Sequence, residues 1–258
     1  MNNIHPSAII DPAARLHESV SVGPYSVIGA GVEIGEGCTI GSHVTIQGPT
    51  RIGRDNRIFQ FASLGAAPQD KKYNGEPTEL QIGDRNIIRE FVTMNRGTPS
   101  GGGVTRVGSD GLFMAYVHVA HDCIVGDKVI FSNNASLAGH VHVGDYVILS
   151  GFTLVHQFCA IGAHAFTGMG SAIARDVPPY LMIAGNPAAP HGINREGLKR
   201  RGFSSEAISQ LKQGYRLLYR SGLSLDDARQ ALDEMAVNSA EVAKLAVFIG
   251  ESRRSIIR

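Results

Sequence analysis

Hydrophobic residues return at every sixth position through the first quarter of the chain. The run begins at Ile4 and reaches Leu64 without a break. With 43% of the chain hydrophobic, eleven successive matches would arise by chance about once in ten thousand registers. The spacing returns from Val107 to Ile173, where only Thr167 interrupts it. A period of six fits a short strand followed by a corner, repeated around a prism. The pattern therefore predicts a mainly β fold, a parallel β-helix of hexapeptide repeats.

One corner of this prism is marked by an aliphatic residue followed by glycine. The glycines of these pairs are Gly108, Gly126, Gly144 and Gly162. They lie eighteen residues apart, so three hexads complete one coil and the prism has three faces. Because glycine has no Cβ atom, it can adopt a positive φ angle, and we expect these glycines to do so.

The period fails in two places. Asp70 and Glu76 would fall on inward positions within a polar stretch, so residues 66–80 are expected to loop out. Between Met94 and Val107 the register slips by one residue across a glycine-rich segment, and residues 97–106 are expected to form a second loop. Long loops on a rigid scaffold often carry function.

The hexad pattern ends after Ile183, and a Gly-Asn-Pro segment follows. We expect a β-helix over residues 1–190 and an α-helical C-terminal domain over 191–258. Ser204 and Ser224 precede helical patterns, and a third helix is expected from near Ser239 to Glu251. These helices can cap the open end of the repeat array.

The formal net charge of +1 gives no sign of a nucleic-acid partner. No stretch has the pattern of a signal peptide or a membrane span. The three cysteines, Cys38, Cys123 and Cys159, have neither pairing nor metal-binding spacing. We therefore expect a cytoplasmic protein that binds no nucleic acid and does not insert into a membrane.

Histidines gather in the second repeat series, at His118, His121, His140 and His156. One coil after His121 comes Gly139, and one coil later Gln157, so these three residues are expected in one column. Neighbouring coils of such a column lie about 4.8 Å apart. By the same count Asp122 lies beneath His140. Together they could supply a general base, an orienting carboxylate and a backbone N–H for an oxyanion.

Two alternatives remain open from the residues alone. Histidines on neighbouring coils could hold zinc, as in hexapeptide carbonic anhydrases, and the protein would then be a zinc hydratase. The spacing of His118 and His121 is only a loose match to such a site. Alternatively, a purely structural or ligand-binding solenoid would carry these histidines as surface residues.

Five stretches carry a resemblance to a known family: residues 55–63, 117–123, 137–141, 155–159 and 196–203. Through them the chain resembles the UDP-N-acetylglucosamine O-acyltransferases of lipid A biosynthesis over essentially its full length. These enzymes belong to the hexapeptide-repeat transferase superfamily. The resemblance implies a left-handed β-helix, a homotrimer with sites at subunit boundaries, and chemistry without a metal or bound cofactor.

The same resemblance implies transfer of a 3-hydroxyacyl group from acyl carrier protein to the 3-hydroxyl of the GlcNAc ring of UDP-GlcNAc. His121 would be the general base, Asp122 its orienting partner and the Gly139 N–H the oxyanion donor. An imidazole suits a base because its ordinary pKa is about 6.5. The substrate contacts that the resemblance implies are Gln69, Asp70, Lys72, His118, His140, His156 and Gln157. Those implied for the UDP group are Asn194, Glu196, Arg200 and Arg201.

Met169 occupies the position at which the resemblance places the far end of the acyl chain. It follows His121 by 48 residues, or about 2.7 coils, which is roughly 13 Å along the axis. An extended chain of about ten carbons covers that length. We therefore predict a preference for 3-hydroxydecanoyl over 3-hydroxymyristoyl donors.

Overall fold

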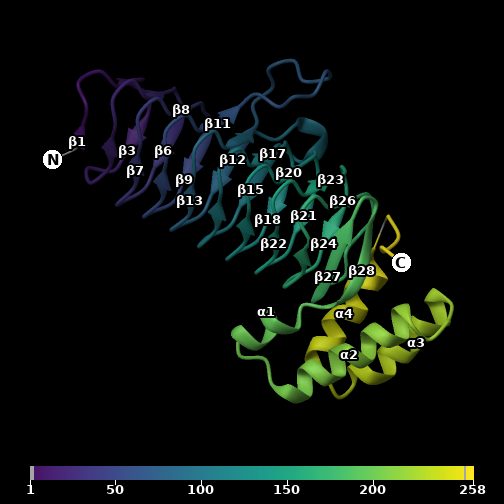
Figure 1. Ribbon diagram of the computed structural model, residues 1–258. Coiled ribbons are helices and arrows are strands. Elements are labelled where there is room, and N and C mark those ends of the chain that lie inside the picture. Colours follow the sequence, from purple (N-terminus) through teal and green to yellow (C-terminus); the bar gives the residue numbers. More distant parts are fainter. Residues whose placement is uncertain (1–2, 253) are drawn as a thin grey trace.

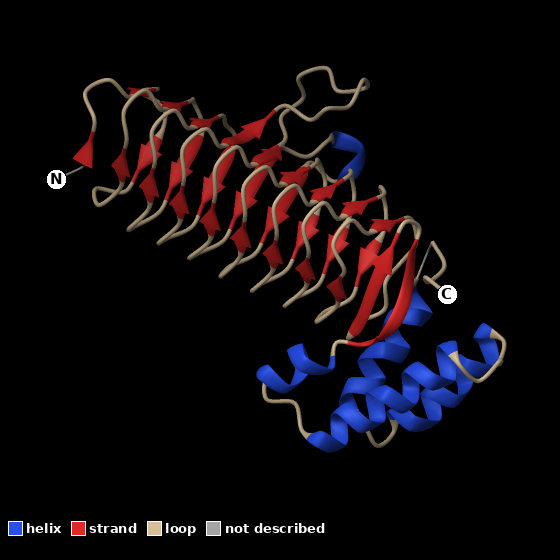
Figure 2. Cartoon of the chain, viewed as in Figure 1, coloured by secondary structure: helices blue, strands red, loops and turns tan. Residues whose placement is uncertain are grey.

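The computed structural model describes residues 3–252 and 254–258. These residues form a left-handed parallel β-helix with a group of α-helices at its C-terminal end (Figures 1 and 2). The predicted fold class is confirmed. No helix among the described residues is both long and apolar enough to cross a membrane.

Three sheets form the faces of the prism, and we name them A, B and C. Sheet A contains β1 (Asn3–Ile4), β4 (Ser21–Val22), β7 (Thr39–Ile40), β10 (Arg57–Ile58), β13 (Ile87–Ile88), β16 (Leu112–Phe113), β19 (Ile130–Phe131), β22 (Ile148–Leu149), β25 (Phe166–Thr167), β27 (Leu181–Gly185) and β28 (Ala188–Ile193). Sheet B contains β2 (Ile9–Ile10), β5 (Val27–Ile28), β8 (Thr45–Ile46), β11 (Ser63–Ala66), β14 (Thr93–Asn95), β17 (His118–Val119), β20 (Ser136–Leu137), β23 (Leu154–Val155) and β26 (Ala172–Ile173). Sheet C contains β3 (Arg15–Leu16), β6 (Val32–Ile34), β9 (Thr50–Ile52), β12 (Glu79–Ile82), β15 (Val104–Val107), β18 (Ile124–Val125), β21 (His142–Val143) and β24 (Ala160–Ile161).

The hexad residue of each coil points into the prism. Ile28, Ile46 and Leu64 stack in register on sheet B and are each no more than 1% exposed. Thr167, the polar residue in the series, is fully buried, and its hydroxyl forms a hydrogen bond of 2.7 Å with that of Thr153. A buried hydroxyl with a partner avoids the desolvation cost of an unpaired one.

The expectation that the corner glycines have positive φ angles is wrong. Positive φ falls two residues later, at Asp110, Lys128, Tyr146 and His164. The glycines are needed for a different reason. A Cβ atom on Gly126 would lie 2.3 Å from the Asp145 carboxylate and 2.8 Å from the Asp145 amide nitrogen of the next coil. Close stacking of successive coils, rather than backbone conformation, therefore requires glycine at this corner.

Both expected loops leave the prism between sheets B and C, at what we call the B–C corner. The first runs from the end of β11 to the start of β12, and the second from β14 to β15. The second contains the short 3-10 helix η1 (Pro99–Gly101). The two loops stand side by side above the middle of the solenoid in Figure 2.

The β structure extends slightly further than the expected boundary at residue 190. Strands β27 and β28 form an antiparallel hairpin on sheet A that ends at Ile193. The helices are α1 (Arg195–Arg200), α2 (Ser205–Tyr219), α3 (Leu225–Ala236) and α4 (Ala240–Glu251). The residues after α4 return to the last coil, where Ile257 joins the solenoid core and Asp176 pairs with Ile256.

Candidate active site

The B–C corner carries the predicted catalytic residues on successive coils. His121 precedes β18, Gly139 and His140 precede β21, and Gln157 precedes β24. The amide of His140 donates to the carbonyl of His121, and that of Phe158 donates to the carbonyl of Gly139. These residues therefore lie in one column, as their spacing of eighteen residues predicted.

His121 and Asp122 form a hydrogen-bonded dyad. The imidazole Nδ1 lies 2.8 Å from Oδ2 of Asp122. A proton on Nδ1 donates to the carboxylate, which leaves Nε2 as the hydrogen-bond acceptor. The His121 side chain is 14% exposed and that of Asp122 only 1%. Solvent therefore reaches the imidazole but hardly reaches the carboxylate that orients it.

The Asp122 carboxylate accepts further hydrogen bonds from the second loop. The Thr98 amide donates to Oδ1 at 2.8 Å, and the Thr98 hydroxyl donates to Oδ2 at 2.6 Å. The backbone of Asp122 is also held, because its amide donates to the Thr105 hydroxyl. These hydrogen bonds hold the buried carboxylate in one position behind the imidazole.

Gly139 packs directly against the His121 ring. A Cβ atom at this position would lie 2.5 Å from Cε1 and 2.8 Å from Nε2. Gly139 is buried, and among the described residues its N–H donates to no protein acceptor. A buried and unpaired N–H beside an imidazole is suited to stabilise a developing oxyanion.

His140 lies on the coil above the dyad. Its Nε2 is 3.7 Å from Asp122 Oδ2, and its ring stacks on Phe158 at a centroid distance of 4.4 Å. Burial lowers the pKa of His140, while the carboxylates of Asp122 and Asp70 act in the opposite direction. His140 is therefore mainly neutral near pH 7.

The other predicted histidine and glutamine contacts lie around the dyad. His118 projects from β17 on sheet B, where its Nδ1 is 2.7 Å from the Thr93 hydroxyl. Burial, and secondly His121, lower the pKa of His118. His156 and Gln157 are exposed, and the Gln157 carbonyl accepts a hydrogen bond from Arg254 at 2.7 Å.

The first loop carries Gln69, Asp70 and Lys72, of which Gln69 and Lys72 are exposed. Arg96 anchors this loop through Gly65 O at its base and the Tyr73 hydroxyl at 3.2 Å. The loop is thereby fixed beside the B–C corner.

The residues predicted to bind UDP lie at another edge of the prism, between sheets C and A. Asn194 caps helix α1, and its Nδ2 donates to the carbonyl of His164. Arg201 donates to the carbonyl of Tyr146 at 2.9 Å and lies over the ring of that residue. Glu196 and Arg200 are exposed. Within one chain these four residues are therefore not part of the histidine cluster.

Met169 lies at the third edge, between sheets A and B. It is 78% exposed, so its side chain does not belong to the core. The count of about 2.7 coils from His121 therefore gave an axial distance but ignored the rotation between corners. His121 and Met169 therefore lie on different corners of a single chain, and the preference for a ten-carbon donor stays a prediction.

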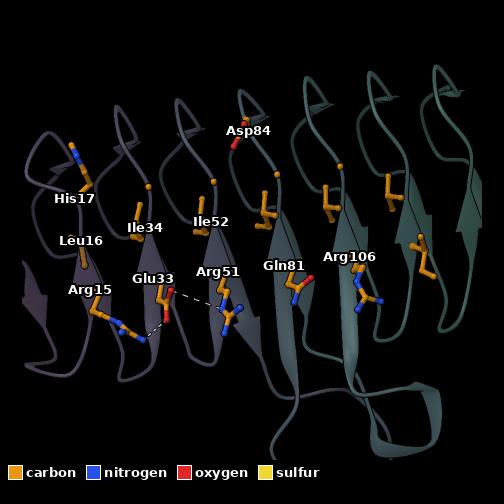
Figure 3. A pocket seen from close by; sticks show the side chains of 18 residues that line it. Arg15, Leu16, His17, Glu33, Ile34, Arg51, Ile52, Gln81, Asp84 and Arg106 are labelled. Atoms are coloured by element: carbon orange, nitrogen blue, oxygen red, sulfur yellow. Dashed lines mark hydrogen bonds and ion pairs between the residues drawn. The ribbon is translucent and has the colours of Figure 1, made fainter.

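Two grooves of about 970 Å³ each lie on sheet C. The first runs from β3 to β18, and Figure 3 shows Arg15, Glu33 and Arg51 on it in a row of ion pairs. Its side chains include no member of the dyad. The second is lined by His140, Phe158 and residues at the end of α4, so it opens beside the histidine corner.

A metal-like arrangement is present at the same corner. The ligand atoms of His121, Asp122 and His140 all lie within 4.8 Å of one another. Both oxygens of the Asp122 carboxylate, however, already accept hydrogen bonds, Oδ1 from the Thr98 amide and Oδ2 from the Thr98 hydroxyl and His121.

The chain matches the family model described as "Udp N-acetylglucosamine O-acyltransferase; Domain 2" over residues 176–257, and the bacterial transferase hexapeptide model over 13–48. It is 60% identical over 262 residues to an acyl-(acyl-carrier-protein)–UDP-N-acetylglucosamine O-acyltransferase of Herminiimonas arsenicoxydans, with 100% of both chains covered. The chain belongs to the UDP-N-acetylglucosamine O-acyltransferase family. The predicted family and enzyme class, an O-acyltransferase, are confirmed.

Other members of this family show the same relationship. The protein of that name from Halorhodospira halophila is 60% identical over 258 residues and covers 100% of both chains. The solved UDP-N-acetylglucosamine acyltransferase of Francisella novicida is 45% identical, with a TM-score of 0.97, covering 99% of this chain and 94% of that one. That of Moraxella catarrhalis is also 45% identical with a TM-score of 0.97, and covers 99% and 100%.

Three residues that support the loops and the dyad were not found from the sequence: Thr98, Thr105 and Arg96. Each lies near the second loop, outside the strict hexad register. One signal could have pointed to them, since both loops interrupt the repeat at the same corner, and one coil after the second loop this corner carries His121.

Proposed function

We propose that this chain transfers a 3-hydroxyacyl group from acyl carrier protein to the 3-hydroxyl of the GlcNAc ring of UDP-GlcNAc, the first step of lipid A biosynthesis. The reaction would take place in the cytoplasm and need no metal or bound cofactor. The observation that carries the proposal is the His121 imidazole, hydrogen-bonded through Nδ1 to buried Asp122 and packed against Gly139, whose N–H donates to no acceptor among the described residues.

The steps follow from this geometry. Nε2 of His121 takes the proton of the sugar hydroxyl as its oxygen attacks the thioester carbonyl carbon. The charge that develops on the carbonyl oxygen is stabilised by the Gly139 N–H, and the imidazolium by Asp122. Collapse of the intermediate breaks the C–S bond, and the carrier thiolate leaves with the proton held on Nε2. Ester and thiol are formed, and the base is restored.

The remaining substrate contacts are proposed to come from more than one copy of the chain. In a single chain the histidine cluster, the α1 residues and Met169 lie on three different corners. A homotrimer would bring different corners together at each subunit boundary. The corner between sheets A and B is suited to such contact, because Tyr25, Phe61, Phe91, Tyr116 and Phe152 are exposed along it by 42 to 63%.

In this arrangement the acyl chain would run from His121 of one copy towards Met169 of a neighbour. The high exposure of Met169 is consistent with a residue that meets a ligand or another subunit. Its side chain would close the groove and favour the ten-carbon 3-hydroxydecanoyl group over 3-hydroxymyristoyl. Exposed Glu196 and Arg200 on α1, with Arg201 beside them, would face the UDP group, since guanidinium groups bind phosphates well.

The direct test is incubation of the purified protein with UDP-GlcNAc and a panel of 3-hydroxyacyl carrier proteins, with the product read by mass. We expect one acyl group added per UDP-GlcNAc, and a rate at least about 100-fold lower for H121A. H17A is the matched control, because His17 is an exposed histidine far from the dyad. No acylated product with any donor, or an active H121A, would contradict the proposal.

A zinc hydratase is the second candidate, and the cluster of His121, Asp122 and His140 is the observation in its favour. Metal analysis of purified protein separates the two functions. The acyltransferase requires full activity after treatment with a chelator, whereas a stoichiometric metal and loss of activity on its removal would favour the hydratase.

A further inference from the structure

The glycine-rich loop of residues 97–103 touches the dyad, although it carries none of the residues predicted for the site. We propose that this loop is a cap that fixes the Asp122 carboxylate, with Thr98 as its positioning residue. The inference rests on the proposed role of the His121–Asp122 dyad, and it assigns a function to the second interruption of the repeat.

Thr98 holds both oxygens of the carboxylate at once. Its amide donates to Oδ1 and its hydroxyl to Oδ2, the oxygen that also accepts from His121 Nδ1. Two donors from one residue prevent the carboxylate from rotating about its Cβ–Cγ bond. Thr98 is only 2% exposed, so water does not compete for these hydrogen bonds. The orientation of Asp122, and through it that of the imidazole, is therefore set by the loop.

The local structure of Thr98 shows that its hydroxyl is not used for the loop's own helix. Thr98 is the N-cap residue of η1, but its side chain makes no capping hydrogen bond. A threonine at an N-cap ordinarily accepts a hydrogen bond from its own helix. Here the hydroxyl is directed at Asp122, and only a 3.2 Å contact with Ser100 lies within the loop.

Glycines allow the loop to approach the carboxylate closely. A Cβ atom on Gly101 would lie 2.0 Å from Cγ of Asp122 and 2.3 and 2.4 Å from its two oxygens. One on Gly97 would lie 2.8 Å from Oδ1. Side chains at these positions would therefore lift the cap from the dyad. A hydrogen bond from the Gly103 amide to the carbonyl of Thr98 joins the two ends of the loop.

We expect the cap to affect the turnover number kcat rather than the binding of substrate. Thr98 bonds to Asp122, and Asp122 holds His121 at Nδ1 rather than at Nε2, the atom proposed to meet the substrate. Loss of the hydroxyl should therefore reduce kcat and leave KM nearly unchanged. A hydrogen bond to a charged group contributes enough for a loss of about tenfold in rate.

The experiment compares T98V, which keeps the shape of the side chain but lacks the hydroxyl, with T98S, which keeps the hydroxyl. We expect kcat to fall about tenfold in T98V, with KM within about twofold, and to stay within about threefold of the starting value in T98S. T39V is the matched threonine control, because Thr39 is exposed on β7 of sheet A, away from the dyad. A T98V enzyme with unchanged kcat, or a T98S enzyme as slow as T98V, would overturn the proposal.

Two further measurements separate positioning from general damage. In an H121A background, T98V should cause no additional loss of rate, because it acts only through the dyad. The downfield proton NMR signal of the His121 Nδ1–H, assigned by its absence in H121A, should be retained in T98S and lost or broadened in T98V. This signal does not depend on acyltransferase activity, so it tests the cap even if the proposed function fails. Additive rate losses, or an unaltered NMR signal in T98V, would overturn the inference.

Discussion

The imidazole of His121 lies directly against the α-carbon of Gly139, on the next coil. A Cβ atom added to Gly139 would come within 2.5 Å of Cε1 and 2.8 Å of Nε2. The distance between coils is set by backbone hydrogen bonds along the whole prism, so the ring rather than the backbone would have to move.

We therefore expect G139A to fold normally and to lose about 100-fold in kcat, because a displacement of about 1 Å in a reacting group costs this much. The measurements are steady-state kinetics and the thermal unfolding midpoint. G151A is the matched control, since a Cβ on Gly151 has no neighbour closer than 3.5 Å. A fully active G139A would show that Nε2 of His121 is not the atom that acts.

The Asp122 carboxylate can be tested without changing its shape. D122N keeps the volume but replaces an acceptor oxygen by an NH2 group, which cannot accept the hydrogen bonds from Thr98 and His121 together. We expect kcat to fall about 100-fold, with the KM for UDP-GlcNAc changed much less. A KM effect that matched the kcat effect would instead indicate that Asp122 binds substrate.

Replacement of Met169 by glycine should lengthen the acyl group that the enzyme accepts. Met169 is 78% exposed on a corner that a neighbouring chain can reach. Competition between 3-hydroxydecanoyl and 3-hydroxymyristoyl carrier proteins should move at least about tenfold towards the longer donor in M169G. A product ratio that remained unchanged would remove Met169 as the determinant of chain length.

His164 should make the stability of the protein depend on pH. Its ring stacks on Tyr146 at 4.8 Å, and burial, followed by Arg201 and Lys244, lowers its pKa to about 4. In the unfolded chain a histidine has a pKa of about 6.5. Between these values the unfolded state binds more protons, so the free energy of unfolding should fall as the pH is lowered from about 6.5 to 4.

H164F retains an aromatic ring in the stack. We expect this substitution to reduce the difference in the free energy of unfolding between pH 7 and pH 5 by about 1 to 2 kcal/mol, after allowance for solvent screening. Urea unfolding at pH 5 and pH 7 measures the difference. H17A, with an exposed histidine, should leave the slope as it is. An equal slope in H164F would mean that other groups cause the acid sensitivity.

The sequence predicted most of the solenoid, because one residue in six must be buried and the chain repeats that requirement. It also predicted the contact between His121 and Gly139, since these residues are eighteen positions apart and one coil contains eighteen residues. The same arithmetic, used in full, would have separated Met169 from His121. Their spacing of 48 residues is two coils plus two thirds of a third, which places them on different corners.

What the sequence did not reveal depends on contacts outside the repeat. Thr98 reaches Asp122 from an irregular loop 24 residues earlier, and no periodicity describes its path. The reason for glycine at Gly126 was also missed, because it lies in the neighbouring coil and not in the local backbone. Asn194 was predicted as a ligand contact, and the sequence did not reveal that its side chain also caps α1 and donates to the His164 carbonyl.

The segment that follows α4 has a consequence for how the protein behaves in concentrated solution. Asp176 accepts hydrogen bonds from the Ala160 amide, the Ser252 hydroxyl and the Arg254 amide, and its main chain pairs with Ile256. The edge of the last coil is thus paired with the protein's own backbone, and the hairpin of β27 and β28 extends sheet A beside it. An unpaired edge would expose backbone N–H and C=O groups that could pair with the strands of another molecule, and such pairing leads to aggregation. The segment therefore blocks the stacking of another chain on the C-terminal end of the prism.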